Sequence, residues 1–429
     1  MRHLVPAEIR EVLVSHRTLR VVLLTDFLVL VSELGLAVIL PWWITSHGGP
    51  QAIAAFSVTL AVAAFFIAPA VSPFGDRICK GKQITWGLGG LFGVALALAA
   101  LAFTGIFSLA GLAALAVLQG LAASFVDPAR DAVLAELMAP AQLPIAMRLR
   151  KTTHAVAGIL GPLLAGAALG SSGATAALAG CATVLAVAML VASRIPRNTS
   201  VKPRRGGLAL WWSDLGAGLA AKWQVPMERG WTAVNFAVWI FQGPAVGLLI
   251  PVKVQALALQ ADWLGLCLGA LSLGVLLGSA FGSQLLVSRF GRYRVRIGLG
   301  FVEGIALAVV GWAASPWLML AGLLAAGFCN AAMSLVGATH RALAIPQAYR
   351  VRIYAAGAMT TRIAGALGPA LVGMALASYS VTCVYMAWGL SMAACVLGFL
   401  FVPRLKEFLT LGHDEIADWY RLQYPAVFR

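Results

Sequence analysis

Twelve apolar runs, each long enough to cross a lipid bilayer as a helix, occupy most of this chain of 429 residues. A membrane-spanning helix needs about 20 predominantly apolar residues. Hydrophobic residues make up 61% of the sequence and charged residues only 11%, so little of the chain is suited to contact with water. We therefore predict an all-α membrane protein with twelve transmembrane helices. The predicted spans are 19–44, 52–74, 84–104, 107–126, 153–171, 174–193, 231–252, 263–287, 296–314, 316–338, 355–377 and 381–402.

Lysine and arginine residues are concentrated in every second connection between these spans. If the N-terminus lies in the cytoplasm, Lys253 is the one basic residue that falls on the external side. Because membrane proteins keep basic residues in cytoplasmic loops, this pattern predicts an even number of spans with both termini cytoplasmic, in an inner membrane of the bacterial type. The net charge of +15 has the same explanation. We expect no nucleic-acid partner, since the basic residues form no single face open to water.

The second half of the chain repeats part of the first. Segments 153–169 and 360–376 share ten identical residues at a constant offset of 207, including the pairs Gly161-Pro162 and Gly368-Pro369. Small residues are common in membrane helices, so chance is the alternative to an internal repeat. The repeat predicts two pseudo-symmetric six-helix bundles. The predicted parts are a cytoplasmic N-terminal segment at 1–18, a first bundle at 19–193, a cytoplasmic linker at 194–230, a second bundle at 231–402 and a cytoplasmic amphipathic tail on the membrane surface at 403–429.

The connection after the second span supports a resemblance to a known family. It reads Gly75-Asp76-Arg77-Ile78-Cys79-Lys80-Gly81-Lys82, which resembles the loop between helices two and three of the major facilitator superfamily, although Ser72 stands where that family usually has glycine. The resemblance covers nearly the whole chain and implies the fold of that superfamily. It also implies a conformational latch that holds the two halves in one state, whereas a solvated loop charge is the alternative. The implied latch residues are Asp76, Arg77, Lys80 and Lys82, with Asp127 and Arg130 at the end of the fourth span.

The fifth predicted span resembles the fifth-helix signature of proton-driven exporters in this superfamily, apart from Ala165, where that signature usually has glycine. Glycine lets helices approach closely, and proline removes a backbone hydrogen bond and kinks a helix. We therefore expect a packed hinge here and in the repeated segment, with a purely structural role as the alternative. The residues concerned are Gly158, Gly161, Pro162 and Gly166, and Gly365, Gly368, Pro369 and Gly373.

Three carboxylates, Asp26, Glu33 and Glu303, lie inside predicted spans. Ionisable groups in a membrane are costly and are functional candidates by default. Asp26 and Glu33 are seven residues apart, which places them on one helix face about 10 Å apart along the axis. We interpret both as proton-coupling candidates, Glu33 first, although Asp26 could instead pair with Arg20 or a basic loop. For Glu303 we expect packing or an interhelical hydrogen bond.

Uncharged polar residues lie in the fourth, seventh and tenth spans, which, with the first, line the central cavity in the resembled superfamily. Amide and hydroxyl groups orient a ligand without fixing its charge. The substrate-cavity candidates are Gln119, Asn235, Gln242, Asn330 and Ser334. The expected partners are a small amphipathic substrate and the lipid bilayer, and we expect a monomer.

No motif points to an enzyme. The six cysteines are far apart and have no partners at metal-binding spacing, which predicts neither disulfides nor a metal site. Gln83 stands where a phosphate-binding loop needs serine or threonine. We expect no cofactor, and the proton motive force as the energy source.

The resemblance leaves three hypotheses about function. The segment Phe125-Val126-Asp127-Pro128-Ala129-Arg130 is similar to siderophore and drug exporters, which implies efflux of an amphipathic molecule by proton antiport and alternating access. Lysophospholipid transporters share this region, and the spacing of Asp76, Lys80 and Lys82 is closer to their pattern. A lysophospholipid flippase is therefore the second hypothesis, and a transport-inactive membrane sensor or scaffold is the third.

Overall fold

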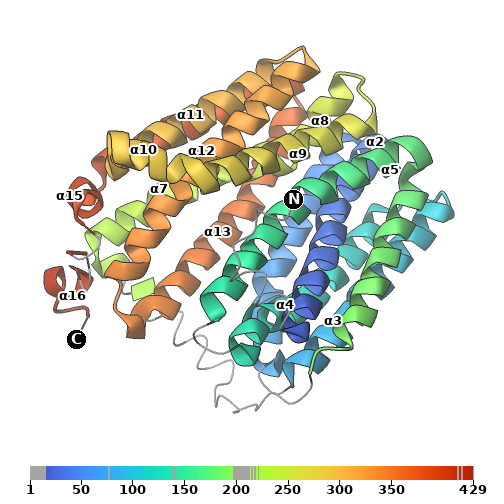
Figure 1. Ribbon diagram of the computed structural model, residues 1–429. Coiled ribbons are helices and arrows are strands. Elements are labelled where there is room, and N and C mark those ends of the chain that lie inside the picture. The colour runs from blue at the N-terminus through green and yellow to red at the C-terminus, as the bar shows by residue number, and fades with distance from the viewer. Residues whose placement is uncertain are drawn as a thin grey trace, which may run out of the picture. The chain divides into compact units, whose positions relative to one another are not determined.

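Helices joined by short turns make up the protein (Figure 1). The computed structural model describes residues 16–75, 78–138, 142–196, 213, 216, 219–220, 222–412, 415–416 and 419–428. No strand occurs within these ranges, which confirms the predicted all-α class. Residues 1–15 of the predicted N-terminal segment and most of the predicted linker lie outside the described residues.

The helices are labelled as in Figure 1. The first part of the chain contains α2 (Arg17–Gly75), α3 (Lys80–Phe103), α4 (Leu109–Leu137) and α5 (Leu143–Ala192). The second part contains α7 (Pro226–Gly247), α8 (Leu249–Ala256), α9 (Ala261–Leu277), the π-helical turn η1 (Gly278–Gly282), α10 (Ser283–Phe290), α11 (Arg292–Trp312), α12 (Pro316–Ala344), α13 (Gln347–Leu376), α14 (Val381–Leu397), the short 3-10 turn η2 (Gly398–Phe401), α15 (Leu405–Thr410) and α16 (Trp419–Gln423).

Nine helices within the described residues are long and apolar enough to span a membrane, and α7 with α8, bent by 43°, would make a tenth. Two of the nine are interrupted by a glycine with positive φ, at Gly49 (72°) in α2 and at Gly173 (78°) in α5. Side chains disfavour this backbone conformation, so glycine is the residue that allows the chain to turn there. Gly49 falls between the first two predicted spans and Gly173 between the fifth and sixth. The total of twelve depends on dividing both helices at these points and stays a prediction.

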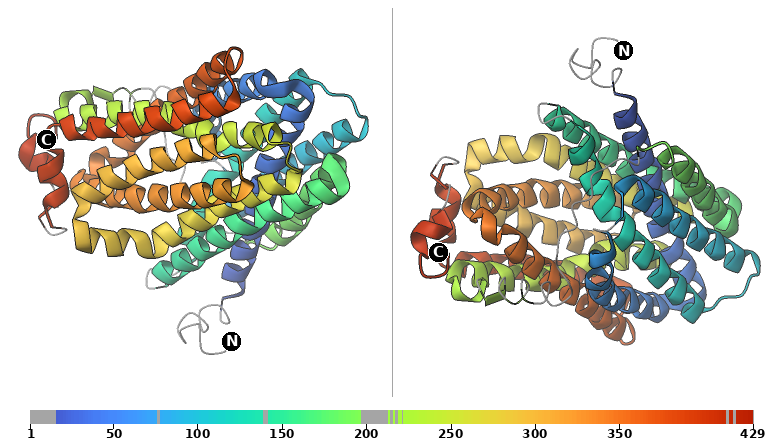
Figure 2. Two further views of the ribbon diagram at one scale, coloured as in Figure 1. Left: turned by 90° about the horizontal axis from the view of Figure 1, so that it is seen from above. Right: turned by 90° about the horizontal axis from the view of Figure 1, so that it is seen from below.

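The chain divides into two compact units, which we describe separately. Unit 1 comprises the described residues of Met1–His47 and Phe66–Gly207, and unit 2 those of Gly48–Phe65 and Leu208–Arg429. In unit 1, α3 packs against both α4 and α5 around buried apolar side chains. In unit 2, α11 packs against α12 and α14, and α12 also packs against α9, as both views in Figure 2 show.

The repeated glycines lie at close helix contacts. A Cβ atom added to Gly161 of α5 would lie 3.0 Å from the backbone oxygen of Val31 in α2, and one added to Gly368 of α13 would lie 2.4 Å from that of Ile240 in α7. A side chain would therefore clash with backbone at Gly368 and would be tight at Gly161. A Cβ on Gly373 would meet Ala54 at 2.7 Å.

The other residues of the predicted hinge segments are placed less tightly. Pro162, Gly166 and Pro369 are buried, and Gly158 is half-buried. A Cβ on Gly365 would meet nothing within 4 Å. The predicted hinge movement is not visible in one structure and stays a prediction.

Lys253, the one basic residue predicted on the external side, is buried in unit 2. Its ammonium group donates hydrogen bonds to the backbone oxygen of Gly311, at 2.7 Å, and to Oγ1 of Thr382, at 3.0 Å. Gly311 lies in the last turn of α11, where carbonyl groups lack helical partners and favour a cation. This lysine therefore ties the end of α11 to α14.

The C-terminal tail packs on unit 2 through its aromatic side chains, at the end of the chain drawn in red in Figures 1 and 2. Phe408, Tyr420 and Phe428 are at most 1% exposed. The ring of Phe428 stacks edge-on against Tyr349 at a centroid distance of 5.0 Å. The apolar face that we expected to lie on the membrane surface is thus buried against protein, because the tail's aromatic rings pack on one another and on unit 2.

Candidate functional site

Asp26 lies at the centre of a buried ion-pair cluster in unit 1. Its carboxylate accepts hydrogen bonds from Nε of Arg130 in α4, at 2.9 Å, and from Nε of Arg150 in α5, at 2.7 Å. The Asp26 side chain is 1% exposed. Its partners therefore come from two other helices rather than from Arg20, and the carboxylate ties α2, α4 and α5 together. Removing one partner of such a buried charge pair strongly destabilises the folded protein.

Glu33 lies beside the same arginine but is held less firmly. Its Oε1 atom is 3.6 Å from a terminal nitrogen of Arg130 and accepts no hydrogen bond from the described residues. The same nitrogen of Arg130 donates to Asp127 at 3.2 Å. Arg130 thus contacts three carboxylates, of which Asp26 holds it most closely.

The cluster contains more acids than fixed cations. Asp131, the fourth carboxylate, accepts a hydrogen bond from Arg150 at 2.7 Å and is 73% exposed. His154 approaches Asp26 at 3.7 Å and is 40% exposed. Four carboxylates thus surround two guanidinium groups. Three of them accept a hydrogen bond from an arginine, whereas Glu33, whose side chain is 24% exposed, accepts none at Oε1 from the described residues. Glu33 is therefore the carboxylate whose protonation would break the fewest interactions while relieving repulsion among its neighbours.

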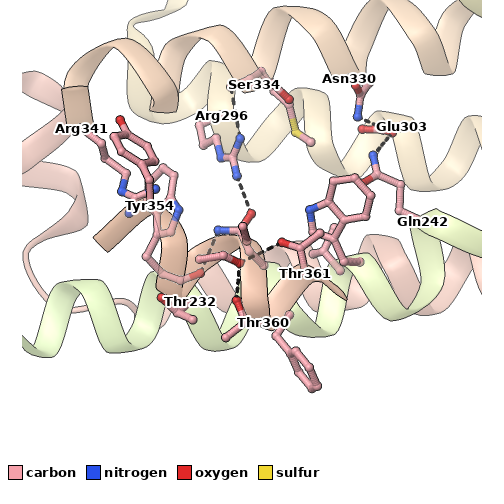
Figure 3. A pocket seen from close by; sticks show the side chains of 18 of the residues that line it. Thr232, Gln242, Arg296, Glu303, Asn330, Ser334, Arg341, Tyr354, Thr360 and Thr361 are labelled. Atoms are coloured by element: carbon pink, nitrogen blue, oxygen red, sulfur yellow. Dashed lines mark hydrogen bonds between the residues drawn. The ribbon is translucent and has the colours of Figure 1, made fainter. Parts of the chain in front are cut away.

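A cavity of about 650 Å³ lies within unit 2, lined by α7, α9, α11, α12 and α13 (Figure 3). Four of the five predicted cavity residues line it: Asn235, Gln242, Asn330 and Ser334. The fifth, Gln119, is half-buried on α4 of unit 1. Sequence reasoning thus grouped four polar residues that the fold brings together from α7 and α12.

Glu303 joins three helices at one side of this cavity. Its Oε1 atom accepts hydrogen bonds from the side-chain amides of Gln242 in α7 and Asn330 in α12, the latter at 3.1 Å. The interhelical hydrogen bonds expected for Glu303 are therefore present. The other oxygen, Oε2, is buried and has no hydrogen-bond partner among the described residues.

Arg296 is a cavity residue that the sequence analysis missed. It lies two turns before Glu303 on α11 and is 5% exposed. Its guanidinium donates to Oδ1 of Asn235 at 3.0 Å and to the backbone oxygen of Met333 at 3.2 Å, and it lies 4.9 Å from the ring centroid of Trp231. Arg296 is the first residue of the predicted span 296–314 and follows several other arginines, so it did not stand out as a cavity residue. Its spacing of seven residues from Glu303 is the signal that places both on one helix face.

A second buried ion-pair cluster lies beside the cavity. Glu228, fully buried at the start of α7, accepts two hydrogen bonds from Arg341, at 2.8 and 2.9 Å, and one from the hydroxyl of Tyr420. Lys222 lies 3.9 Å from Glu228 and donates to Thr232 at 3.1 Å. Burial lowers the pKa of Lys222 to about 8, and the Arg341 charge adds to this, although Glu228 acts in the opposite direction. Because this cluster joins residues far apart in the sequence, it could not be predicted from a local motif.

The predicted latch is only partly described. Asp76 and Arg77 lie outside the described residues. Lys80 is half-buried and Lys82 exposed in the first turn of α3. Asp127 and Arg130 belong instead to the Asp26 cluster, so the structure brings them together with the predicted proton-coupling residues.

Helices of membrane-spanning length around a cavity with buried charges in its wall are typical of a multi-pass membrane transporter. Residues 22–260 match the family model of the major facilitator superfamily, more than half of the chain. The chain therefore belongs to the major facilitator superfamily, as the resemblance implied, while the number of twelve spans stays a prediction.

Solved transporter structures share this fold. A peptide transporter of the POT family, solved with sulfate, is 14% identical with a TM-score of 0.70, over 92% of this chain and 96% of its own. A bacterial homologue of the iron transporter ferroportin, in an inward-facing state, is 18% identical with a TM-score of 0.70, over 92% and 99%. A nucleoside transporter is 12% identical with a TM-score of 0.69, over 90% and 100%. A search of curated proteins found no match. At these identities, the similarity shows the fold alone.

Proposed function

We propose that this protein is a proton-coupled secondary transporter in which Glu33 carries the coupling proton. Membership of the major facilitator superfamily supports secondary transport in general. The observation that carries the proposal is the position of Glu33, 3.6 Å from Arg130 and without a hydrogen bond to Oε1 among the described residues. It is the carboxylate of this cluster best placed to gain and lose a proton.

Arg130 would transmit the protonation state of Glu33 to the helices. With Glu33 protonated and neutral, the guanidinium is shared between Asp26 and Asp127. When Glu33 releases its proton, a third negative charge competes for the same guanidinium. A proton can shift a conformational equilibrium only if it binds the two states with different affinity. Arg130 contacts carboxylates of α2 and of its own helix, and Arg150 links Asp26 to α5, so the proton on Glu33 would act on the packing of these three helices.

We propose export of an amphipathic molecule, a drug or siderophore, by antiport with protons across a bacterial-type inner membrane, with both termini cytoplasmic. The resemblance of the segment 125–130 to siderophore and drug exporters supports this direction. The structural neighbours do not limit the choice of substrate class, because they are named as transporters of peptides, iron and nucleosides. A lysophospholipid transporter is the alternative that the experiment below distinguishes.

Proteoliposomes with an imposed pH gradient test the proposal. The probes are rhodamine 6G, a fluorescently labelled dodecanoate and a fluorescently labelled lysophosphatidylglycerol. We expect at least one of the first two to accumulate only when the gradient is present, and Glu33→Gln to abolish the effect of the gradient. Glu407→Gln, which changes an exposed glutamate of the tail, is the matched control and should transport as the wild type does.

Two results would overturn the proposal. Equal gradient-driven rates in the wild type and Glu33→Gln would remove Glu33 from coupling. Movement of the labelled lysophospholipid alone, without any gradient, would favour the lysophospholipid transporter. If no probe moves and a protein partner is recovered instead, the sensor or scaffold hypothesis gains support.

A further inference from the structure

Arg296 is a buried cation without a carboxylate partner in the described part of unit 2. Arg296 is 5% exposed, and its hydrogen bonds to described residues go to a backbone oxygen and an amide oxygen rather than to a carboxylate. Its Nε atom is buried and has no hydrogen-bond partner there. The neutral groups that it does contact, Asn235 and the backbone oxygen of Met333, satisfy two of its donors but do not neutralise its charge.

A buried charge is costly unless it is paired. Glu303, on the same helix, is the acid that lines the cavity with Arg296. Its Oε1 atom is already occupied by two amide donors, from Gln242 and Asn330. In Figure 3, Glu303 with these two amides lies to one side, apart from the Arg296 guanidinium. That guanidinium donates instead to Asn235. Glu303 therefore does not act as a direct counter-ion for Arg296.

The remaining charges near the cavity leave an excess of positive charge. Lys222 and Arg341 also line the cavity, and both are paired with the single carboxylate of Glu228. Three cations thus stand against two carboxylates, Glu228 and Glu303. An anion entering the cavity would meet net positive charge, whereas a cation would be repelled.

The walls of the cavity fit the apolar part of such a ligand. Its volume of about 650 Å³ lies in the range of small-molecule sites, which runs from about 300 to 1,000 Å³. Trp239 and Tyr354 line it with side chains that are each 40% exposed. Trp231 lies under the Arg296 guanidinium and holds it in place by a cation–π contact.

We propose that this cavity binds an amphipathic molecule with one carboxylate or phosphate group, and that Arg296 receives the anionic group. The proposal rests on the proposed transport function and narrows its substrate to anionic amphipathic molecules. Arg296 presents donors in a planar fork, which matches the oxygens of both carboxylate and phosphate. The aromatic side chains contact the hydrocarbon part.

Calorimetric titration of the full chain in phosphatidylcholine nanodiscs tests the proposal without any gradient, so its outcome is separate from that of the coupling experiment. The probes are hexanoate, hexyl phosphate and hexyltrimethylammonium, with empty nanodiscs as the blank. We expect one or both anions to bind, and the cation to bind far more weakly. A preference for hexyl phosphate would point to a phosphate headgroup, and a preference for hexanoate to a carboxylic acid. Equal binding of anions and cation would overturn the proposal.

Arg296→Gln should weaken anion binding by about 30-fold, as expected for the loss of one charged contact. Arg294→Gln removes an exposed arginine from the same helix and should bind as the wild type does. Unchanged anion affinity in a monodisperse Arg296→Gln protein would overturn the proposal. If that variant does not fold, Arg296→Lys keeps the charge and should keep the preference for anions over the cation; loss of that preference in a folded Arg296→Lys protein would also overturn it.

Discussion

Arg130 donates a hydrogen bond to Asp26 at 2.9 Å, although the two residues are 104 positions apart in the sequence. Both side chains are at most 5% exposed. This contact fixes α4 against α2, and it places the rest of the Arg130 guanidinium next to Glu33 and Asp127. The same pair thus serves the packing of unit 1 and the proposed coupling.

Removing this arginine should destabilise the protein strongly. Arg130→Gln leaves Asp26 with one guanidinium partner instead of two, and breaking a buried ion pair costs about 3–5 kcal/mol. We expect a large fall in the thermal midpoint of the detergent-solubilised protein, followed by loss of monodispersity. Arg148→Gln, at an exposed arginine of α5, should leave the midpoint unchanged. Adding Asp26→Asn to Arg130→Gln should restore part of the loss; no restoration would argue against direct pairing.

The repeated glycines allow a comparison within one helix. Gly368→Ala places a Cβ atom 2.4 Å from the backbone oxygen of Ile240, whereas Gly365→Ala meets nothing within 4 Å. Overpacking typically costs about 1–3 kcal/mol, while alanine favours a helix over glycine by about 0.8–1 kcal/mol. We therefore expect Gly368→Ala to lower the thermal midpoint and Gly365→Ala to raise it or leave it unchanged. Equal midpoints for the two variants would contradict the close contact of α13 with α7.

Much of the architecture could be predicted because a bilayer limits what a chain can do. Backbone groups in lipid must be satisfied within helices, so apolar runs of span length predict the helices well. The repeat around Gly161 and Gly368 also pointed to real contacts, because close helix approach needs small residues at fixed positions. The breaks at Gly49 and Gly173 lie between consecutive predicted spans.

The partners of buried charges could not be predicted in the same way. Arg130 was expected in the latch, and a basic loop was only one alternative partner for Asp26. In the structure, Arg130 and Arg150 both reach Asp26. The pairing depends on which helices are neighbours and how each is rotated, and neither property is encoded in local spacing. Glu228 and Tyr420, which are 192 residues apart, illustrate the same limit. Arg296 is different, since its spacing from Glu303 was visible in the sequence.

The hydroxyl group of Tyr420 should contribute to holding the C-terminal tail against the rest of unit 2. Tyr420→Phe removes the hydrogen bond to the buried carboxylate of Glu228, and a hydrogen bond to a charged group contributes about 1.5–3 kcal/mol. We expect faster proteolytic cleavage of the tail in the folded protein. Tyr379→Phe, at a residue that is 68% exposed, is the control and should be cleaved at the wild-type rate. Equal cleavage of Tyr420→Phe and wild type would show that aromatic packing alone holds the tail.

Lys222 should make stability depend on alkaline pH. Burial lowers its pKa from the usual 10.5 to about 8 in the folded protein. Below that range, both the folded and the unfolded protein hold the proton, and the buried charge is destabilising. Between the two values, the unfolded protein binds more protons, so the contribution of Lys222 to stability becomes more favourable as pH rises.

The thermal midpoint of wild type minus that of Lys222→Met should therefore rise between pH 8 and 10.5. Lys82→Met, at an exposed lysine of α3, corrects for the general effect of alkaline pH and should show no such rise. If the thermal midpoints of the wild type and Lys222→Met change with pH in parallel, the lowered pKa of Lys222 is ruled out.

Infrared difference spectroscopy of the purified protein in nanodiscs tests the central claim most directly, because it detects carboxyl protonation without a substrate. Spectra recorded on acidification should contain a protonated-carboxyl band that is present in Asp26→Asn and missing in Glu33→Gln. That result would identify Glu33 as the group in the Arg130 cluster that takes up the proton. A band that disappears in Asp26→Asn and persists unchanged in Glu33→Gln would contradict the account.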